Sequence, residues 1–412
     1  MIRSRFASTL SSIFRNCRTL RSGTLNSASL ANSLSQTLFS LGEQYSSATT
    51  LYNHDVHDSA KSSDDRVPAT IITGFLGSGK TTLLNHILTS QHGKRLAVIE
   101  NEFGEVDIDG ALVASHSTST DDIIMVNNGC LCCTVRGDLV RMLLDLVKKK
   151  RDKFDHIVIE TTGLAKPGPV IETFCSDELL TSKVKLDGVV TMVDAKHGLK
   201  QLNELKPRFV VNEAVEQVAY ADRIILNKTD LASEMQLGQI TRRIKQINSM
   251  APIKLAKHGS VDMDFVLGIG GYDLESKAEE LNCSGHQKNP CLCGFESVVV
   301  ESERGHHDCS VGSVSIVSEG NLDREEVEDW LERLIEEKGE DLYRMKGVLS
   351  IDGSDQRYIF QGVQSMFDWC NGDKWELGET RVNKLVFIGR NLDETMLRKG
   401  FKGCCLSPIL TI

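Results

Sequence analysis

The chain has 412 residues, enough for two or three domains, and its 40% apolar and 25% charged residues are ordinary values for a globular protein. No run of about 18 apolar residues occurs, so we expect no membrane-spanning helix. The formal net charge is -10, although residues 1–42 contain five arginines and neither Asp nor Glu. The rest of the chain is therefore more acidic than the total suggests, which argues against broad nucleic-acid binding.

Residues 1–62 have the composition expected of an organelle transit peptide. Ten serines accompany the five arginines within residues 1–42, and no acidic residue interrupts them. Ile2, Phe6, Leu10 and Ile13 would fall roughly on one face of a helix. The early arginines favour a mitochondrial over a chloroplast destination, and a plain disordered tail is the alternative. We leave this segment out of the fold prediction.

Strands and helices are predicted to alternate over residues 63–268. Short runs of β-branched and apolar residues predict strands, and longer amphipathic or polar runs predict helices. The predicted strands are 67–73, 95–99, 123–126, 156–159, 188–193 and 223–226, and the predicted helices are 80–90, 139–150 and 235–246. This alternation predicts an α/β fold with a mostly parallel, doubly wound sheet. The loops that follow its strands would share one edge, where ligands bind.

A smaller second unit is predicted after residue 268. Residues 269–312 are polar and contain several Cys and His residues, which indicates a linker. Strands are then predicted at 313–318, 347–351, 357–362 and 384–389, with a charged amphipathic helix at 324–337. We therefore expect a small α+β domain over residues 313–392, followed by a tail over residues 393–412.

Residues 74–81, Gly-Phe-Leu-Gly-Ser-Gly-Lys-Thr, fit the pattern G-x-x-x-x-G-K-[ST] between a predicted strand and a predicted helix. The glycines let backbone N–H groups turn toward phosphate oxygens, and the helix N-terminus adds a favourable partial charge. We expect Lys80 to contact the β- and γ-phosphates and Thr81 to ligate Mg²⁺. The first domain is thus predicted to be a P-loop NTPase domain, with nucleotide contacts from Gly74, Gly77, Ser78, Gly79, Lys80, Thr81 and Thr82.

Asn227-Lys228-Thr229-Asp230 follows a predicted strand about 150 residues after the phosphate loop, and it is the guanine-reading pattern of P-loop GTPases. The Asp230 carboxylate can accept hydrogen bonds from the ring N–H and the exocyclic amine of guanine. Adenine has an acceptor where guanine has that ring donor, so the carboxylate would be left unpaired. We therefore predict a preference for GTP over ATP, with Asn227, Lys228 and Asp230 at the base.

A third nucleotide element is predicted at the end of the strand that leads to Glu160. Residues 157–163 read Ile-Val-Ile-Glu-Thr-Thr-Gly. Most P-loop GTPases have Asp at the position of Glu160. We expect Glu160 to hold Mg²⁺ through water and the N–H of Gly163 to sense the γ-phosphate. A solvated acid at a strand end is the alternative interpretation.

Cys130-Leu131-Cys132-Cys133 follows another predicted strand and Asn127-Asn128-Gly129. On a turn, three thiolates can converge on one cation, and soft sulfur ligands suit Zn²⁺ or Cu(I) rather than Mg²⁺. Three sulfurs leave one tetrahedral position open, which suits a site that releases its metal. The alternatives are buried apolar cysteines or a strained disulfide.

The phosphate loop, residues 100–105 (Glu-Asn-Glu-Phe-Gly-Glu), the Cys130–Cys133 motif, residues 160–163 and residues 227–230 occur in an order that resembles the CobW-type GTPases. This family includes the zinc-regulated GTPase metalloprotein activators and is related to the nickel-insertion GTPases of hydrogenase and urease maturation. The resemblance covers about residues 68–392, and residues 313–392 look like the C-terminal CobW domain. It implies metal-dependent GTP hydrolysis, metal transfer to a client metalloprotein, and a switch-like role for residues 100–105.

The resemblance also adds candidate ligands. Glu100 and Glu105 are candidates for oxygen ligands beside the cysteines, or else ordinary exposed carboxylates. The family often carries a His-rich loop before its C-terminal domain. The corresponding segment here is modest, and it leaves a second metal-collecting site and a disordered linker both open; its residues are Cys283, His286, Cys291, Cys293, His306, His307 and Cys309.

We therefore expect a GTP-hydrolysing metallochaperone that uses GTP, Mg²⁺ and a transition metal, with Zn²⁺ favoured and Co²⁺ the alternative. GTP would order residues 100–107 and 160–163 and so change the geometry around the cysteines. Lys80, Glu160 and Glu102 are the catalytic candidates, and the hydrolytic base stays open among Glu102, Asp107 and Glu160.

The expected partner is a client metalloprotein, with no nucleic acid or membrane, and self-association stays open. Three alternatives depend on the same motifs. The chain could assist cobalt handling in cobalamin metabolism, although thiolate ligands favour zinc. It could be a kinase or ATPase, which the guanine-reading motif opposes. It could also be a non-enzymatic metal reservoir that uses the Cys/His linker.

Overall fold

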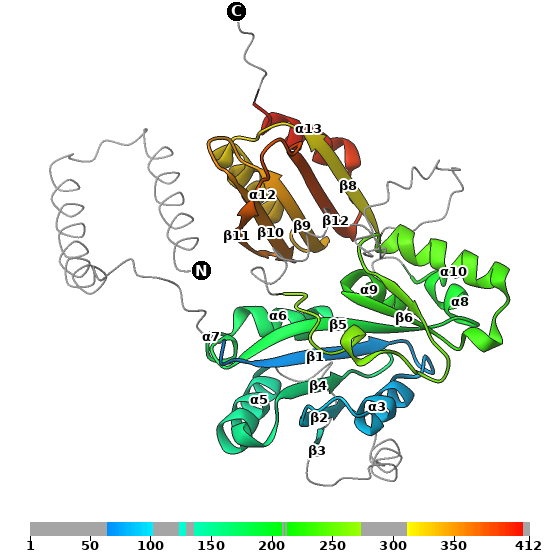
Figure 1. Ribbon diagram of the computed structural model, residues 1–412. Coiled ribbons are helices and arrows are strands. Elements are labelled where there is room, and N and C mark those ends of the chain that lie inside the picture. The colour runs from blue at the N-terminus through cyan, green and yellow to red at the C-terminus, as the bar shows by residue number, and fades with distance from the viewer. Residues whose placement is uncertain are drawn as a thin grey trace, which may run out of the picture. The chain divides into compact units, whose positions relative to one another are not determined.

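The computed structural model describes residues 64–101, 123–128, 136–207, 210, 212–272 and 311–406. From Asp65 onward these residues belong to one compact unit, which contains a seven-stranded and a five-stranded sheet (Figure 1). The predicted transit segment and the Cys/His segment 283–309 lie outside the described residues. Within the described ranges, no helix combines the length and the hydropathy that crossing a membrane requires.

The seven-stranded sheet has the strand order β3-β2-β4-β1-β5-β6-β7, and every neighbouring pair is parallel. In the described connections helices carry the chain from one strand to the next, since parallel neighbours need a crossover. The elements are β1 (Val67–Gly74), α3 (Lys80–Thr89), β2 (Leu96–Asn101), β3 (Ile123–Asn128), α5 (Arg136–Lys150), β4 (His156–Glu160), α6 (Gly168–Ser176), α7 (Glu178–Thr181), β5 (Val184–Asp194), α8 (Gly198–Leu202), α9 (Glu213–Tyr220), β6 (Arg223–Asn227), α10 (Glu234–Ile247) and β7 (Ile253–Leu255).

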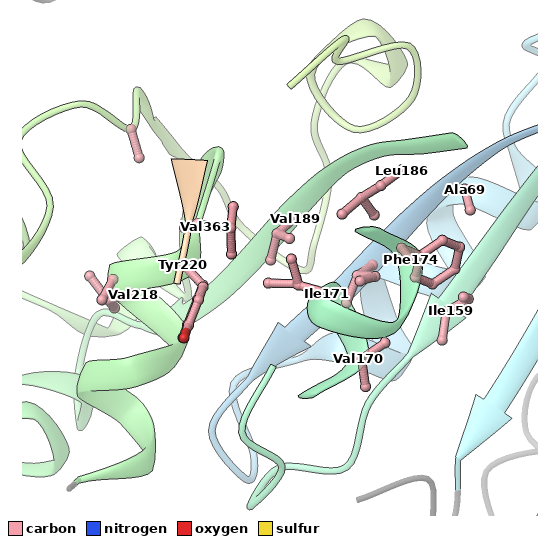
Figure 2. Packing of buried hydrophobic residues seen from close by; sticks show 14 of the residues in the cluster. Ala69, Ile159, Val170, Ile171, Phe174, Leu186, Val189, Val218, Tyr220 and Val363 are labelled. Atoms are coloured by element: carbon pink, nitrogen blue, oxygen red, sulfur yellow. The ribbon is translucent and has the colours of Figure 1, made fainter. Parts of the chain in front are cut away.

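Both faces of this sheet are buried, which confirms the predicted doubly wound fold. On β1, Ala69 and Ile71 pack in one apolar cluster together with residues of α5, α6, α9 and α10. Ile72 points the other way, into a second cluster with α3 and the segment 261–269. Figure 2 shows part of the first cluster, including Phe174 of α6 and Tyr220 of α9. The continuous apolar runs of the strands follow from this burial on two sides.

The five-stranded sheet is antiparallel, with the order β11-β10-β9-β12-β8. On β12, Leu385 and Phe387 face a cluster that includes α12 and α13, while Val386 and Ile388 join the core of the first sheet. Helices therefore cover one face and the nucleotide-binding domain covers the other. The elements are β8 (Val311–Glu319), α12 (Arg324–Lys338), β9 (Leu342–Ser350), β10 (Gln356–Val363), β11 (Met366–Lys374), β12 (Val382–Arg390) and α13 (Glu394–Gly403).

A buried ion pair and an aromatic stack join the two sheets. Nη2 of Arg344 on β9 lies 2.7 Å from Oδ1 of Asp222, and both side chains are 3–4% exposed. Nη1 of Arg344 donates to the carbonyl of Tyr220, whose ring stacks on Tyr343 with centroids 5.1 Å apart. Because a buried charge that loses its partner costs several kcal/mol, about 3–5, this contact fixes one arrangement of the two sheets.

The structure extends the predicted domains in two places. Helix α13 lies within residues 393–412, which we had predicted to be a tail, and ordered chain of the first domain continues past 268 to Tyr272. The buried residues of α13 are Leu397 and Phe401, four residues apart on one face, so the apolar pattern that indicates this helix is short. The better signal is Asp393, whose side chain accepts from the N–H of Met396 and caps the helix.

A buried histidine, His156 at the start of β4, makes the stability of the fold depend on pH. Nε2 of His156 lies 2.7 Å from Oγ1 of Thr70, which donates its proton to Asp187 at 2.9 Å. The Thr70 hydroxyl must then accept a hydrogen bond from Nε2–H of His156, and a neutral imidazole can donate that bond. Burial lowers the pKa of His156 to about 4, although Asp187 opposes the shift.

We predict that acid weakens the fold through His156. The unfolded imidazole has a pKa near 6.5, so as the pH falls from about 6.5 to about 4 the unfolded chain takes up a proton that the folded chain does not. Over that window, roughly 3 kcal/mol of the free energy of unfolding should be lost. Denaturant titrations across the pH range measure this loss, and His156→Gln should reduce its slope. Equal slopes in the two proteins would contradict the assignment.

Candidate nucleotide site

The phosphate loop leaves β1 at Gly74 and enters α3 at Lys80, as the sequence predicts. Gly79 caps α3 with a φ of 105°, and a Cβ atom there would collide with the side-chain nitrogen of Asn227. Glycine is therefore required both for the left-handed backbone and for the close contact. The first turn of α3 has no side-chain cap at this residue, so its N–H groups are available to an anion at the loop.

Lys80 and two hydroxyl groups give the loop the chemistry of a phosphate site. Nζ of Lys80 is buried and donates to the carbonyls of Gly74 at 3.0 Å and Phe75 at 3.5 Å. Within the described part of the chain, the buried hydroxyls of Ser78 and Thr162 have no hydrogen-bond partner. Buried polar atoms of this kind call for a partner such as a phosphate oxygen or a metal-bound water. These residues therefore fit a nucleoside triphosphate and its Mg²⁺.

The turn after β4 lies directly against the phosphate loop. Glu160 ends β4 next to Ile72 of β1, and the N–H of the following Thr161 donates to the Ile72 carbonyl at 2.9 Å. A Cβ atom at Gly163 would lie 2.7 Å from the backbone nitrogen of Leu76, so only glycine fits. The structure thus brings together the loop and the two residues predicted to contact Mg²⁺ and the γ-phosphate.

The guanine-reading motif also contacts the loop. Nδ2 of Asn227 donates to the Ser78 carbonyl at 3.1 Å, and Nζ of Lys228 donates to the Gly77 carbonyl at 2.6 Å. Lys228 has a left-handed backbone with φ 60°. Asp230 follows in the short helix Thr229–Leu231, with an exposed side chain. Asn227 and Lys228 therefore brace the loop, while Asp230 is accessible to a base. Of the two predicted threonines, Thr81 is half-buried and Thr82 is exposed.

Asp194 is a member of the site that our sequence analysis missed. It ends β5 opposite Asn227 of β6, is buried, and accepts from Nζ of Lys228 at 2.8 Å. The backbone N–H groups of Lys196 and His197 donate to its other oxygen. Burial opposes ionisation, but the hydrogen bonds from Lys228 and His197 outweigh it and hold the pKa of Asp194 below its usual value. A carboxylate at the end of a buried parallel strand was the available signal.

The predicted transition-metal ligands are not covered by the structure. Cys130, Cys132, Cys133, Glu102 and Glu105 lie outside the described residues, and of Glu100 only the backbone at the end of β2 is described. The backbone places the strands that lead to them side by side, since Glu100 pairs with Asn127 and Asn101 with Asn128. In the described ranges no three Cys, His or acidic side chains gather in a way that would hold a metal.

We predict that Asp194→Asn weakens nucleotide binding. The neutral amide cannot hold the Lys228 ammonium in place, and a hydrogen bond to a charged group contributes roughly 1.5–3 kcal/mol. Affinity for GTP and GDP should fall together, by roughly tenfold to a hundredfold, in titrations with fluorescent nucleotides. Asp355→Asn is the matched control because Asp355 forms an exposed pair with Lys374 on the other sheet. An unchanged affinity in the Asp194 variant would refute the role.

A second substitution tests base selection. Asp230→Ala removes the carboxylate that is expected to pair with guanine, so the ratio of GTP affinity to ATP affinity should fall by roughly a hundredfold or more. Competition of GTP and ATP for the same fluorescent GDP complex measures this ratio. Discrimination equal to that of the unaltered protein would exclude Asp230 as the base-reading residue.

Two family models match this chain, one over each sheet. A family model described as "CobW/HypB/UreG, nucleotide-binding domain" matches residues 68–254. A second model, "Cobalamin synthesis protein cobW C-terminal domain", matches residues 311–405, which include α13. The two matches coincide with the seven-stranded and five-stranded sheets.

Individual relatives agree with the family models. The zinc chaperone YjiA of Escherichia coli is 39% identical over 346 residues, which cover 82% of this chain and 98% of that protein. The zinc-regulated GTPase metalloprotein activator 1 of Schizosaccharomyces pombe is 33% identical over 387 residues, 85% of this chain and 91% of that protein. The crystal structure of the Zn(II)-bound YjiA GTPase from E. coli has 35% identity and a TM-score of 0.64, and covers 83% of this chain and 99% of its own. The chain belongs to the CobW/HypB/UreG family.

Proposed function

We propose that this P-loop GTPase is a zinc chaperone, which binds Zn²⁺ through Cys130, Cys132 and Cys133 and transfers it to a client metalloprotein during its GTPase cycle. The order of the strands is the observation that supports this proposal. Strand β3 leads to the cysteine motif, and β2 and β4 separate it from β1, which leads to the phosphate loop. All four strands are parallel, so their carboxyl ends share one edge of the sheet.

The spacing of those strands suits communication between the two sites. Neighbouring strands lie about 4.8 Å apart, so β3 and β1 are separated by about 14 Å. Glu160 ends β4, and the next strand is β2, which ends at Asn101 and leads to the predicted switch segment. The γ-phosphate turn and residues 100–105 therefore lie at the ends of two neighbouring strands, with no strand between them.

Each nucleotide element has a defined part in the proposed cycle. The loop N–H groups and Lys80 bind the phosphates, and Thr81 and Glu160 would hold Mg²⁺, which supplies positive charge to the β- and γ-phosphate oxygens. Water attacks the γ-phosphorus as its bond to the bridging oxygen breaks, which gives GDP and phosphate. Loss of the γ-phosphate removes what Gly163 is expected to contact, so the turn can relax.

The chemistry of the cysteines and the names of the relatives support zinc as the cargo. Thiolates are ligands that suit Zn²⁺, and three of them leave one tetrahedral position for a client ligand. The relatives include proteins named as zinc chaperones and as metalloprotein activators. Among the cysteines that the structure describes, Cys175 and Cys404 are poor ligands, since burial raises the pKa of Cys175 to about 11 and that of Cys404 to about 12.

A competitive Zn²⁺ titration of the reduced protein tests the proposal. We expect Zn²⁺ affinity to differ by roughly 5- to 150-fold between the GDP complex and the complex with a non-hydrolysable GTP analogue. By linkage, Zn²⁺ must change the ratio of the two nucleotide affinities by the same factor. Cys132→Ser should abolish this difference without weakening nucleotide binding, whereas Cys370→Ser on β11 should leave it intact. Equal Zn²⁺ affinity in both nucleotide states would refute the coupling.

A further inference from the structure

Gln217 on α9 is attached to the turn that follows β4. Its side chain is 1% exposed, and Nε2 donates to the carbonyl of Gly163 at 3.1 Å and to the carbonyl of Ala165 at 3.0 Å. Both hydrogens of one amide are therefore used on one turn. Any hydrogen-bond acceptors would satisfy the amide of a buried glutamine, whereas Gln217 donates to two carbonyls of one turn, two residues apart.

These two bonds restrict the residue that is expected to sense the γ-phosphate. Gly163 lies against the backbone of Leu76 on the phosphate loop, so closely that a Cβ atom would not fit. The hydrogen bond from Gln217 to the Gly163 carbonyl fixes the orientation of the peptide that links Gly163 to Leu164. The turn has one backbone hydrogen bond of its own, from the N–H of Ala165 to the Thr162 carbonyl at 3.0 Å. Because glycine has wide conformational freedom, the bonds from Gln217 restrict the turn further.

Helix α9 is itself held in place on two sides. Oγ1 of Thr191 on β5 donates to the backbone carbonyl of Gln217 at 2.7 Å, which anchors the helix to the large sheet. The neighbouring Glu216 accepts from the hydroxyl of Tyr343 on β9 at 3.4 Å, and Tyr220 stacks on the same tyrosine. The helix that carries Gln217 is therefore positioned by both sheets, and its amide transmits that position to the turn.

We propose that Gln217 is a positioning residue for GTP hydrolysis, which holds the 163–165 turn in the conformation that receives the γ-phosphate. It contacts the turn and not the nucleotide, so it acts through Gly163. Because GDP lacks the γ-phosphate, loss of this bond affects the triphosphate complex and leaves the diphosphate complex nearly unchanged. The inference rests on the nucleotide site alone and needs no metal transfer.

The test compares the Gln217→Met variant with the unaltered protein, both as the full-length chain. Methionine has a similar length and no donor, so the turn loses both hydrogen bonds while the volume is kept. We expect kcat for GTP to fall by about tenfold or more, since small misplacements of reacting groups have effects of that size. Affinity for a fluorescent GDP should stay within about twofold, and affinity for a non-hydrolysable GTP analogue should fall by more than affinity for GDP.

Asn383→Leu is the matched control, because it removes a buried amide that donates to two backbone carbonyls, those of Ser318 and Gly320, on the five-stranded sheet. It should lower the melting temperature and leave kcat unchanged. If Gln217→Met does not bind GDP, Gln217→Leu takes its place, since leucine also lacks a donor for the two carbonyls. The proposal is overturned if kcat is unchanged, if GDP and the analogue lose affinity equally, or if Asn383→Leu shows the same loss of kcat. Failure of zinc delivery would change none of these values.

Discussion

Parallel pairing in the large sheet is the constraint on which the rest of the site depends. Six of its strands end in segments that our account assigns to nucleotide or metal: β1, β2, β3, β4, β5 and β6. Since every neighbouring pair is parallel, these ends meet at one edge, where the N-terminus of α3, which has no side-chain cap, favours an anion. An antiparallel pair anywhere between β3 and β6 would send one of these segments to the opposite edge.

A set of polar contacts holds the phosphate loop at that edge. Asn227 and Lys228 donate to two successive loop carbonyls, and Asp194 holds the Lys228 ammonium between itself and Gly77. The loop is thus supported from the guanine side by charged hydrogen bonds, which are stronger than neutral ones. From the other side the loop contacts Gly163, and we propose that Gln217 holds the backbone of Gly163 in place. Base recognition and γ-phosphate recognition therefore act on one short loop from two directions.

The sequence predicted the fold class, the family and all the described nucleotide motifs, because each of them is written in consecutive residues. Asp194 and Gln217 could not be predicted in the same way. Asp194 matters because register places it beside Asn227, and Gln217 matters because α9 packs against the turn after β4. Strand β11 and helix α9 were missed because the apolar pattern of each is weak or short. The exposed β11 alternates weakly, and α9 has eight residues that are all buried except Glu213.

Nucleotide occupancy and the thiolate-bound metal must influence each other if the strand order serves the proposed function. Cobalt(II) bound in place of zinc reports this directly, because thiolate ligands give charge-transfer absorption that depends on the number and arrangement of the sulfurs. Our account predicts that the Co²⁺ complex of the reduced protein shows this absorption, and that exchanging GDP for a non-hydrolysable GTP analogue changes its intensity. An identical spectrum in both nucleotide states, or a spectrum without thiolate bands, would contradict the account.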